Sequence, residues 1–143
     1  MISGDCGELS EGRCRVKRIL LVDDNPDHRL IVSTLLESYD YLCYEAEDGG
    51  IALQMLERKP IDLVVTDLNM PRMDGLQLIE SIAAHPIFYA VPIILVTSQI
   101  PNIRPSFWEK SHVVAILPKP YDREKLVSVV LSATENHQSM VHL

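Results

Sequence analysis

Residues 19–24 read Ile19-Leu20-Leu21-Val22-Asp23-Asp24, an apolar run that ends in two carboxylates. Three further apolar runs each end in a polar group as well: residues 61–67 end in Asp67, residues 92–97 in Thr97, and residues 113–119 in Lys119. Short continuous apolar runs are typical of parallel strands that are covered on both faces. A ligand binds such a sheet outside the carboxyl ends of its strands. The sequence therefore predicts that these polar groups share one site.

The segments between the runs have the spacing of amphipathic helices. Residues 26–38 follow Asn25, a capping residue placed before a proline at the first helical position. Three other segments carry a one-sided apolar stripe: residues 48–59, 74–84 and 122–133. Residues 41–46 alternate between apolar and other side chains and predict one more strand. This alternation predicts an α/β fold, a doubly wound five-stranded parallel sheet with helices on both faces.

Length and composition indicate one globular domain. The chain has 143 residues and a formal net charge of -7, and this acidity argues against a nucleic-acid surface, which needs clustered Lys and Arg. We expect residues 17–134 to form the domain, residues 1–16 a polar N-terminal extension and residues 135–143 a polar C-terminal tail. No apolar run approaches the ~20 residues that span a bilayer, so we expect a cytoplasmic protein without membrane contact.

The three cysteines, Cys6, Cys14 and Cys43, are odd in number and lack the paired spacing of zinc sites. We expect free thiols in a reducing compartment.

The candidate site combines three carboxylates with a cation and a hydroxyl. Asp23, Asp24 and Asp67 would repel one another unless a cation neutralised them, and Mg²⁺ binds such oxygens together with water and phosphate. Lys119 and Thr97 would supply a second cation and a hydrogen-bond donor for phosphoryl oxygens. Any one of these residues alone would be read as an ordinary surface group or helix cap. Their convergence favours a phosphoryl-handling site.

Four motifs in this order resemble the receiver domain of bacterial response regulators, the CheY-like family of two-component signalling. They are Val22-Asp23-Asp24-Asn25, Thr66-Asp67-Leu68-Asn69-Met70-Pro71-Arg72-Met73-Asp74-Gly75, Val96-Thr97-Ser98 and Pro118-Lys119-Pro120. The resemblance covers residues 18–133 and implies a flavodoxin-like sheet with strand order 2-1-3-4-5. It also implies a cis peptide bond between Lys119 and Pro120.

The resemblance implies a role for each site residue. Asp67 would accept the phosphoryl group from a sensor histidine kinase or a histidine phosphotransfer protein. Asp24 and Asp67 would ligate Mg²⁺ through their side chains and Asn69 through its backbone carbonyl, with Asp23 assisting. Lys119 would pair with the acceptor and then with the phosphate, and Thr97 would move toward the phosphoryl oxygens.

The implied activity is that of a phosphoacceptor in a phosphorelay rather than an enzyme, with only slow self-catalysed phosphorylation and dephosphorylation. We expect a stand-alone receiver that signals through a protein partner, as a monomer or weak dimer. Phosphorylation would shift a two-state population.

Two departures from the family pattern concern the activation switch. Ile116 stands where the family usually has an inward-turning aromatic side chain. Pro101 and Pro105 interrupt the family's fourth helix, so we expect that helix to be short and to start near Pro105, or to be displaced. Phe107 and Trp108 would then either form an exposed partner-binding patch or pack against the sheet.

Two other functions are compatible with parts of the pattern. A pseudo-receiver would bind partners without phosphorylation. A Mg²⁺-dependent phosphatase of the haloacid-dehalogenase type also uses an Asp nucleophile, but it places an acid catalyst where Asn69 stands, and its acidic pair lies late in the chain. Of the histidines, His28 lies closest to the acidic residues; it would either tune them or, as we expect, face solvent on its helix.

Overall fold

The computed structural model describes residues 16–99 and 105–142, with side chains placed up to residue 135. Strands and helices alternate along these residues, and their bounds are β1 (Arg18–Val22), α2 (Pro26–Glu37), β2 (Leu42–Ala46), α3 (Gly49–Arg58), β3 (Leu63–Asp67), α4 (Gly75–Ala83), β4 (Ile93–Thr97), α5 (Pro105–Lys110), β5 (Val113–Pro118) and α6 (Arg123–His142). Every strand predicted from the sequence is present, and each predicted helix starts within one residue of its expected position.

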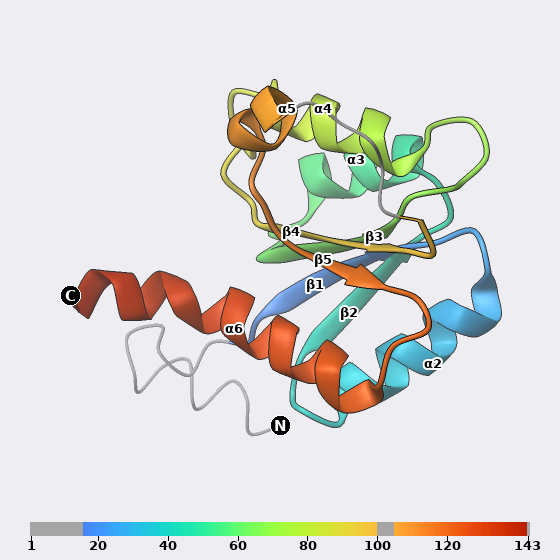
Figure 1. The fold of residues 1–143 in the computed structure, drawn as a ribbon, viewed down its shortest axis with the longest axis vertical. Coiled ribbons are helices and arrows are strands. Elements are labelled where there is room, and N and C mark those ends of the chain that lie inside the picture. Colours follow the sequence, from blue (N-terminus) through green and yellow to red (C-terminus); the bar gives the residue numbers. More distant parts are fainter. Residues whose placement is uncertain (1–15, 100–104, 143) are drawn as a thin grey trace.

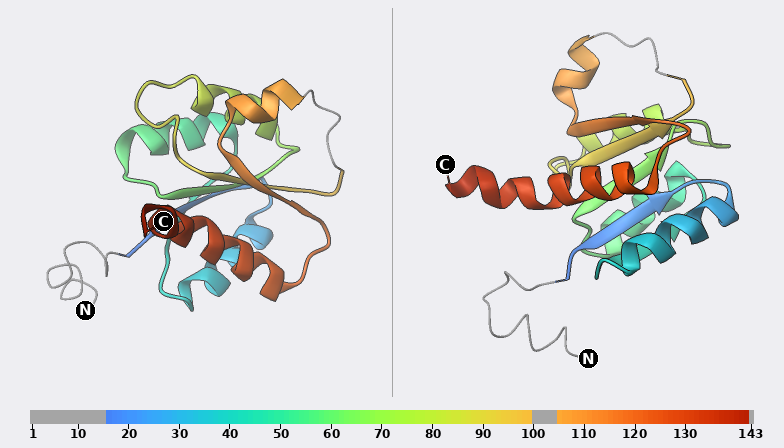
Figure 2. Two further views of the ribbon diagram at one scale, coloured as in Figure 1. Left: turned by 60° about the vertical axis from the view of Figure 1, so that its left-hand side comes forward. Right: turned by 60° about the horizontal axis from the view of Figure 1, so that its bottom comes forward.

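The five strands form one parallel sheet in the order β2-β1-β3-β4-β5. Helices α3, α4 and α5 cover one face of this sheet, and α2 and α6 cover the other (Figure 1). The two further views in Figure 2 show the same three layers. The predicted doubly wound α/β fold and its strand order are therefore confirmed.

The central strands bury side chains on both faces, which explains their continuous apolar character. Leu20 and Leu95 pack with α3 and α4 on one side, and Ile19 and Ile94 pack with α2 and α6 on the other. These four side chains are fully buried. Each such burial contributes about 1.5–3 kcal/mol relative to exposure, so the two apolar layers hold the strand ends in fixed register.

Acidic and amide side chains start three of the helices at the carboxyl ends of the strands. Asn25 accepts hydrogen bonds from the N–H groups of Asp27 and His28, ahead of Pro26 at the first helical position. Asp48 caps α3, and Asp74 caps α4 through a capping box with Gln77. These caps satisfy N–H groups that a helix leaves open, and they fix where each chain segment turns away from the site.

Two features differ from the sequence-based expectation, and a third, the free thiol of Cys43, agrees with it. Helix α6 continues to His142, beyond the end of the apolar stripe at Ala133. Strand β5 lies at one edge of the sheet and is not covered on both sides: its pairing with β4 skips Val114, and this side chain is 52% exposed. Cys43 carries a free thiol and is half-buried, whereas Cys6 and Cys14 lie outside the described residues.

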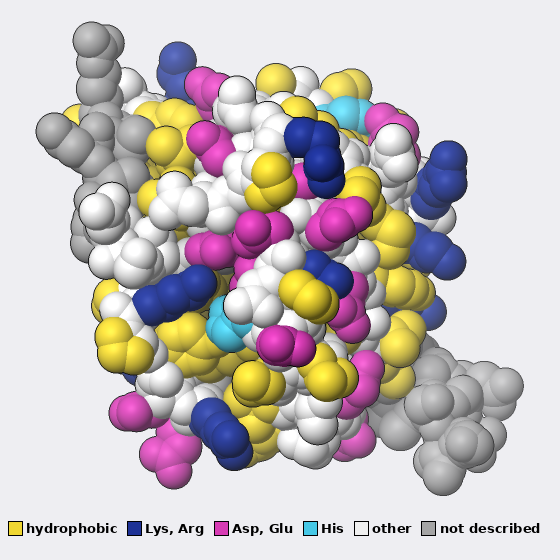
Figure 3. Space-filling model, turned by 90° about the vertical axis from the view of Figure 1, so that its right-hand side faces the viewer, with side chains coloured by type: hydrophobic (Ala, Val, Ile, Leu, Met, Phe, Trp, Pro, Cys, Tyr) yellow, Lys and Arg dark blue, Asp and Glu magenta, His cyan; other side chains and the backbone are white. Residues whose placement is uncertain are grey.

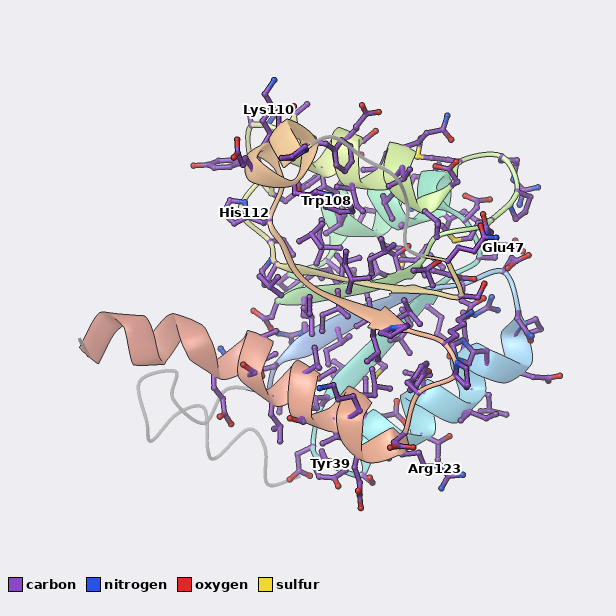
Figure 4. All side chains as sticks on the ribbon, viewed as in Figure 1. Tyr39, Glu47, Trp108, Lys110, His112 and Arg123 are labelled. Atoms are coloured by element: carbon purple, nitrogen blue, oxygen red, sulfur yellow. The ribbon has the colours of Figure 1, made fainter. Side chains whose placement is uncertain are left out.

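Helix α5 begins at Pro105 and spans six residues, so the predicted short helix is confirmed. Pro101 lies outside the described residues. Phe107 and Trp108 form an edge-to-face pair and pack against the core under α5, and Figure 4 shows where Trp108 lies relative to the sheet. This favours the packing interpretation of the two aromatic residues over an exposed patch. Among the described residues no helix combines the length and apolar character that crossing a membrane requires.

Candidate functional site

The predicted site residues meet at the edge of the sheet where the strands end. Asp23 follows β1 directly, Asp67 is the last residue of β3, Thr97 is the last residue of β4, and Lys119 follows β5 directly. Figure 3 shows this side of the molecule, with acidic side chains gathered near its middle and basic and histidine side chains beside them. The apolar runs therefore position the site as well as the core.

Three carboxylates form the centre of the site. Asp23, Asp24 and Asp67 each offer an oxygen, and these oxygens all lie within 4.8 Å of one another. Asp23 is buried, Asp67 is half-buried and Asp24 is exposed, so the cluster opens to solvent on one side. A set made only of carboxylate oxygens suits a hard dication that keeps part of its water shell, as Mg²⁺ does. The arrangement fits the cation expected from the sequence.

Lys119 contacts the carboxylate cluster at Asp67. Its Nζ lies 3.3 Å from Oδ1 of Asp67, and its backbone N–H donates to the carbonyl of Thr97 over 2.8 Å. The backbone bond extends the pairing of β4 and β5 beyond the last strand residues, which places the lysine over the end of β3. The predicted cis peptide bond between Lys119 and Pro120 is present.

The surroundings of Asp67 and Asp23 move their pKa values in opposite directions. Burial raises the pKa of Asp67 above its ordinary value, and the negative charge of Asp23 adds to this, although Lys119 opposes both. Burial would also raise the pKa of Asp23, but hydrogen bonds from His28 and from the N–H of Asn25 outweigh it and lower that pKa. The charge of Asp67 is thus the less well compensated of the two.

Thr97 and Asn69 do not face the carboxylates in the same direct way. Thr97 is buried, and its hydroxyl donates to the carbonyl of Gln99 over 2.8 Å while accepting the N–H of the same residue. These two bonds would have to break before the hydroxyl turned to a phosphoryl oxygen. Asn69 is an exposed residue of the loop between β3 and α4.

A hydrogen bond closes the base of the loop between β3 and α4, and an ion pair and a further hydrogen bond attach this loop to the start of α3. The N–H of Gly75 donates to the carbonyl of Leu68 over 2.8 Å. Arg72, which has a positive φ of 66°, contacts the buried carboxylate of Asp48 at 2.7 Å, and the N–H of Gly49 donates to the carbonyl of Met73. The start of α3 therefore holds the segment that carries Asn69.

The prediction that His28 faces solvent is wrong. Its Nδ1 contacts Oδ2 of Asp23, and its Nε2 lies 2.8 Å from the hydroxyl of Tyr121. The side chain is 28% exposed. His28 lies in the first turn of α2, and its side chain reaches Asp23 at the end of β1 rather than solvent. Tyr121 was missed because no sequence pattern links it to His28, which lies 93 positions earlier in the chain.

Comparison with known proteins assigns the family. The family model described as "Response regulator receiver domain" matches residues 19–131. The sensor histidine kinase GacS of Pseudomonas protegens is 33% identical over 123 residues, which are 84% of this chain and 13% of that protein. The transcriptional regulatory protein GlrR of Escherichia coli is 34% identical over 119 residues, which are 82% of this chain and 26% of that protein.

Solved structures agree with this assignment. The crystal structure of a CheY-like response regulator receiver domain protein from Methanospirillum hungatei superposes with a TM-score of 0.78 at 25% identity, over 87% of this chain and 98% of that one. The fold and the acidic edge define a CheY-like receiver of two-component signalling. The chain belongs to the family of response regulator receiver domains. The chain spans about a tenth to a quarter of the length of the curated relatives that it matches.

Proposed function

We propose that the chain accepts a phosphoryl group on Asp67 from a sensor histidine kinase or a histidine phosphotransfer protein. The observation that supports this most is the carboxylate cluster together with the lysine 3.3 Å from Asp67. The charge of Asp67 is less well compensated than that of Asp23, and Asp67 stands in the motif in which receiver domains carry their phosphoacceptor. The class of donor is taken from relatives that are sensor histidine kinases.

Asp24 and Asp67 would hold Mg²⁺ through their side chains and Asn69 through its backbone carbonyl, with Asp23 assisting. The cation would neutralise the carboxylates and the incoming phosphoryl oxygens. Lys119 would stay with the acceptor carboxylate before transfer and with the phosphoryl group after it. Thr97 would exchange its bonds to Gln99 for a bond to a phosphoryl oxygen, and this exchange would alter the loop that follows β4.

We further propose that the chain signals through a protein partner as a stand-alone receiver, and that it works in the cytoplasm as a monomer or weak dimer. The receiver unit would be residues 17–134, an assignment supported by the matched range of 19–131. Residues 1–16 and 135–143 would flank it as the polar extension and tail. Receiver domains generally act as phosphoacceptors, so we propose only slow self-catalysed turnover.

Incubation with acetyl phosphate and Mg²⁺, followed by intact-mass measurement, tests the proposal. We expect the wild-type chain to gain the mass of one phosphoryl group and the Asp67→Asn variant to gain none. Asp40→Asn is the matched control, because Asp40 is exposed, has a positive φ of 70° that Asn adopts readily, and lies at the turn between α2 and β2. A wild-type chain that gains no mass would refute phosphorylation and favour the pseudo-receiver.

The phosphatase alternative has its own measurement. Steady turnover of para-nitrophenyl phosphate that Asp67→Asn abolishes would identify an enzyme. We expect no such turnover, because the exposed amide of Asn69 stands where that class of phosphatase has its acid catalyst.

A further inference from the structure

His28 is held from two sides at the rim of the acidic cluster. It lies in the first turn of α2, where one ring nitrogen, Nδ1, contacts Oδ2 of Asp23. The other nitrogen, Nε2, lies 2.8 Å from the hydroxyl of Tyr121, in the segment between β5 and α6. The two rings meet edge to face, with their centroids 6.1 Å apart. Two elements that are distant in sequence therefore determine the orientation of one imidazole.

These contacts determine which nitrogen of a neutral imidazole carries the proton. A carboxylate only accepts hydrogen bonds, so Nδ1 of His28 must be the donor toward Asp23. Nε2 is then the acceptor, and the hydroxyl of Tyr121 donates to it. Tyr121 can do this because burial, together with the charges of Asp23 and Asp67, raises its pKa to about 12 and keeps the hydroxyl protonated. The direction of donation is from Tyr121 to His28 to Asp23.

Asp23 is fixed at both carboxylate oxygens by this arrangement. Oδ1 accepts the N–H of Asn25 over 3.0 Å, and Oδ2 accepts from His28. Its backbone carbonyl accepts from Arg29, also on α2. A cavity of about 20 Å³ adjoins the histidine and is lined in part by Asp23, His28, Asp67 and Tyr121. The carboxylate faces the cluster with its rotation restricted and with lone pairs left for a cation or its bound water.

We propose that His28, itself held by Tyr121, is a positioning residue that orients Asp23 toward the cation of the acidic cluster. This inference rests on the proposed function, because it concerns the same cation. Groups that hydrogen-bond to the ligands of a metal orient those ligands, and their removal typically weakens metal binding by 10- to 100-fold. Asp23 differs from Asp24 in this respect, since the exposed Asp24 has no comparable support from α2 among the contacts described.

Titration of the full chain with MgCl₂, followed by the amide NMR signals of the cluster, tests the proposal without a phosphoryl donor. We expect His28→Leu to weaken Mg²⁺ binding by about tenfold. His28→Asn should bind nearly as the wild type does, because the asparagine amide nitrogen takes the place of Nδ1 as a donor. His28→Gln, whose amide nitrogen takes the place of Nε2, should behave like His28→Leu. A role in packing alone would not separate Asn from Gln in this way.

The protonation of the ring provides a second measurement. Nitrogen-15 spectra of the His28 ring should show a proton on Nδ1, the nitrogen that contacts Asp23. Tyr121→Phe should weaken Mg²⁺ binding less than His28→Leu does. His112→Leu is the control, because His112 is exposed and lies at the opposite end of β5 from Lys119 (Figure 4).

Two results would overturn the inference: unchanged Mg²⁺ affinity in His28→Leu, or a His28 ring that carries no proton on Nδ1. Phosphorylation by acetyl phosphate separates this from the proposed function. A wild-type chain that is phosphorylated while His28→Leu binds Mg²⁺ normally would remove the inference alone. A chain whose Mg²⁺ affinity depends on His28 but which is never phosphorylated would remove the proposed function and keep the inference.

Discussion

Replacing Gly75 by alanine should damage both the stability and the site, because this glycine lies against the backbone at the end of β3, where Asp67 and Leu68 lie. A Cβ at position 75 would lie 2.4 Å from the carbonyl oxygen of Asp67 and 2.9 Å from Cα of Leu68. Ordinary contacts begin near 3.4 Å, so the backbone would have to move apart by about 1 Å. The atoms that would move belong to the end of β3, which carries the carboxylate of Asp67.

The other two glycines at helix starts provide graded controls for the size of this effect. Alanine at Gly49 would meet the flexible side chain of Met73 at 2.7 Å, and alanine at Gly50 would meet only Oδ1 of Asp48 at 3.3 Å. Overpacking costs about 1–3 kcal/mol, whereas alanine in a helix gains up to about 1 kcal/mol over glycine. We therefore expect Gly75→Ala to lose about 1–3 kcal/mol, Gly49→Ala to lose less, and Gly50→Ala to be neutral or stabilising.

Urea unfolding monitored by circular dichroism gives the three free energies of unfolding, and acetyl phosphate labelling gives the state of the site. In the absence of urea, where the variant is fully folded, Gly75→Ala should still be phosphorylated more slowly than the wild type. Gly50→Ala should be labelled at the wild-type rate. Equal stabilities of Gly75→Ala and the wild type, or a larger loss in Gly50→Ala, would refute the reasoning from backbone contact.

Three further predictions concern charge and hydrogen bonding. Asp67→Asn should raise the stability at neutral pH. Burial raises the pKa of Asp67, so the folded chain holds this proton more tightly than the unfolded chain, and the contribution of Asp67 to wild-type stability falls as pH rises above about 4. The advantage of the variant in urea unfolding should therefore be larger at neutral pH than near pH 4, and an advantage independent of pH would contradict this. Arg72→Ala should cost about 0.5–1 kcal/mol, a small effect because the arginine is 65% exposed. Because the N–H of Ile51 and then Arg72 hold the pKa of Asp48 low, this cost should be present above the ordinary carboxyl pKa and disappear on acidification; a cost that persists in acid would point to packing instead. Tyr41→Phe should cost about 1 kcal/mol in thermal or urea unfolding, since it removes a buried 2.8 Å hydrogen bond to Thr134, and Thr134→Ala should then add little to it.

The fold and the placement of the acidic cluster were predictable from the sequence because both depend on where apolar runs stop. The run ending at Val22 must leave Asp23 at a strand end, and the same holds for Asp67 and Lys119. The direction of a side chain at a strand end is not set by that pattern. His28 and the hydroxyl of Thr97 were therefore misplaced or left undetermined, since each is decided by a rotamer and by one local hydrogen-bond partner.

The irregular pairing at Val114 could not be predicted from the sequence for a related reason. An edge strand and a central strand can have the same apolar sequence, and only the pairing with β4 distinguishes them. The ion pair of Arg72 with Asp48 joins two loops. It depends on the positive φ of Arg72, a conformation that the sequence does not predict for an arginine.

The opposite pKa shifts of the two inner carboxylates bear on which of them would react. Asp23 is held by the N–H of Asn25 and by His28, so its charge is better compensated within the protein than that of Asp67. Burial and the negative charge of Asp23 disfavour the ionised form of Asp67, whereas the positive charge of Lys119 favours it. A charge that is buried and incompletely compensated is stabilised most by an added dication and is the one whose conversion to an acyl phosphate changes its contacts most. Neighbouring acids that differ in this way take different roles. The proposed difference in role, with Asp23 held in place to assist the cation and Asp67 reacting, thus follows from the donors around each carboxylate: Asn25 and His28 at Asp23, and Lys119 at Asp67.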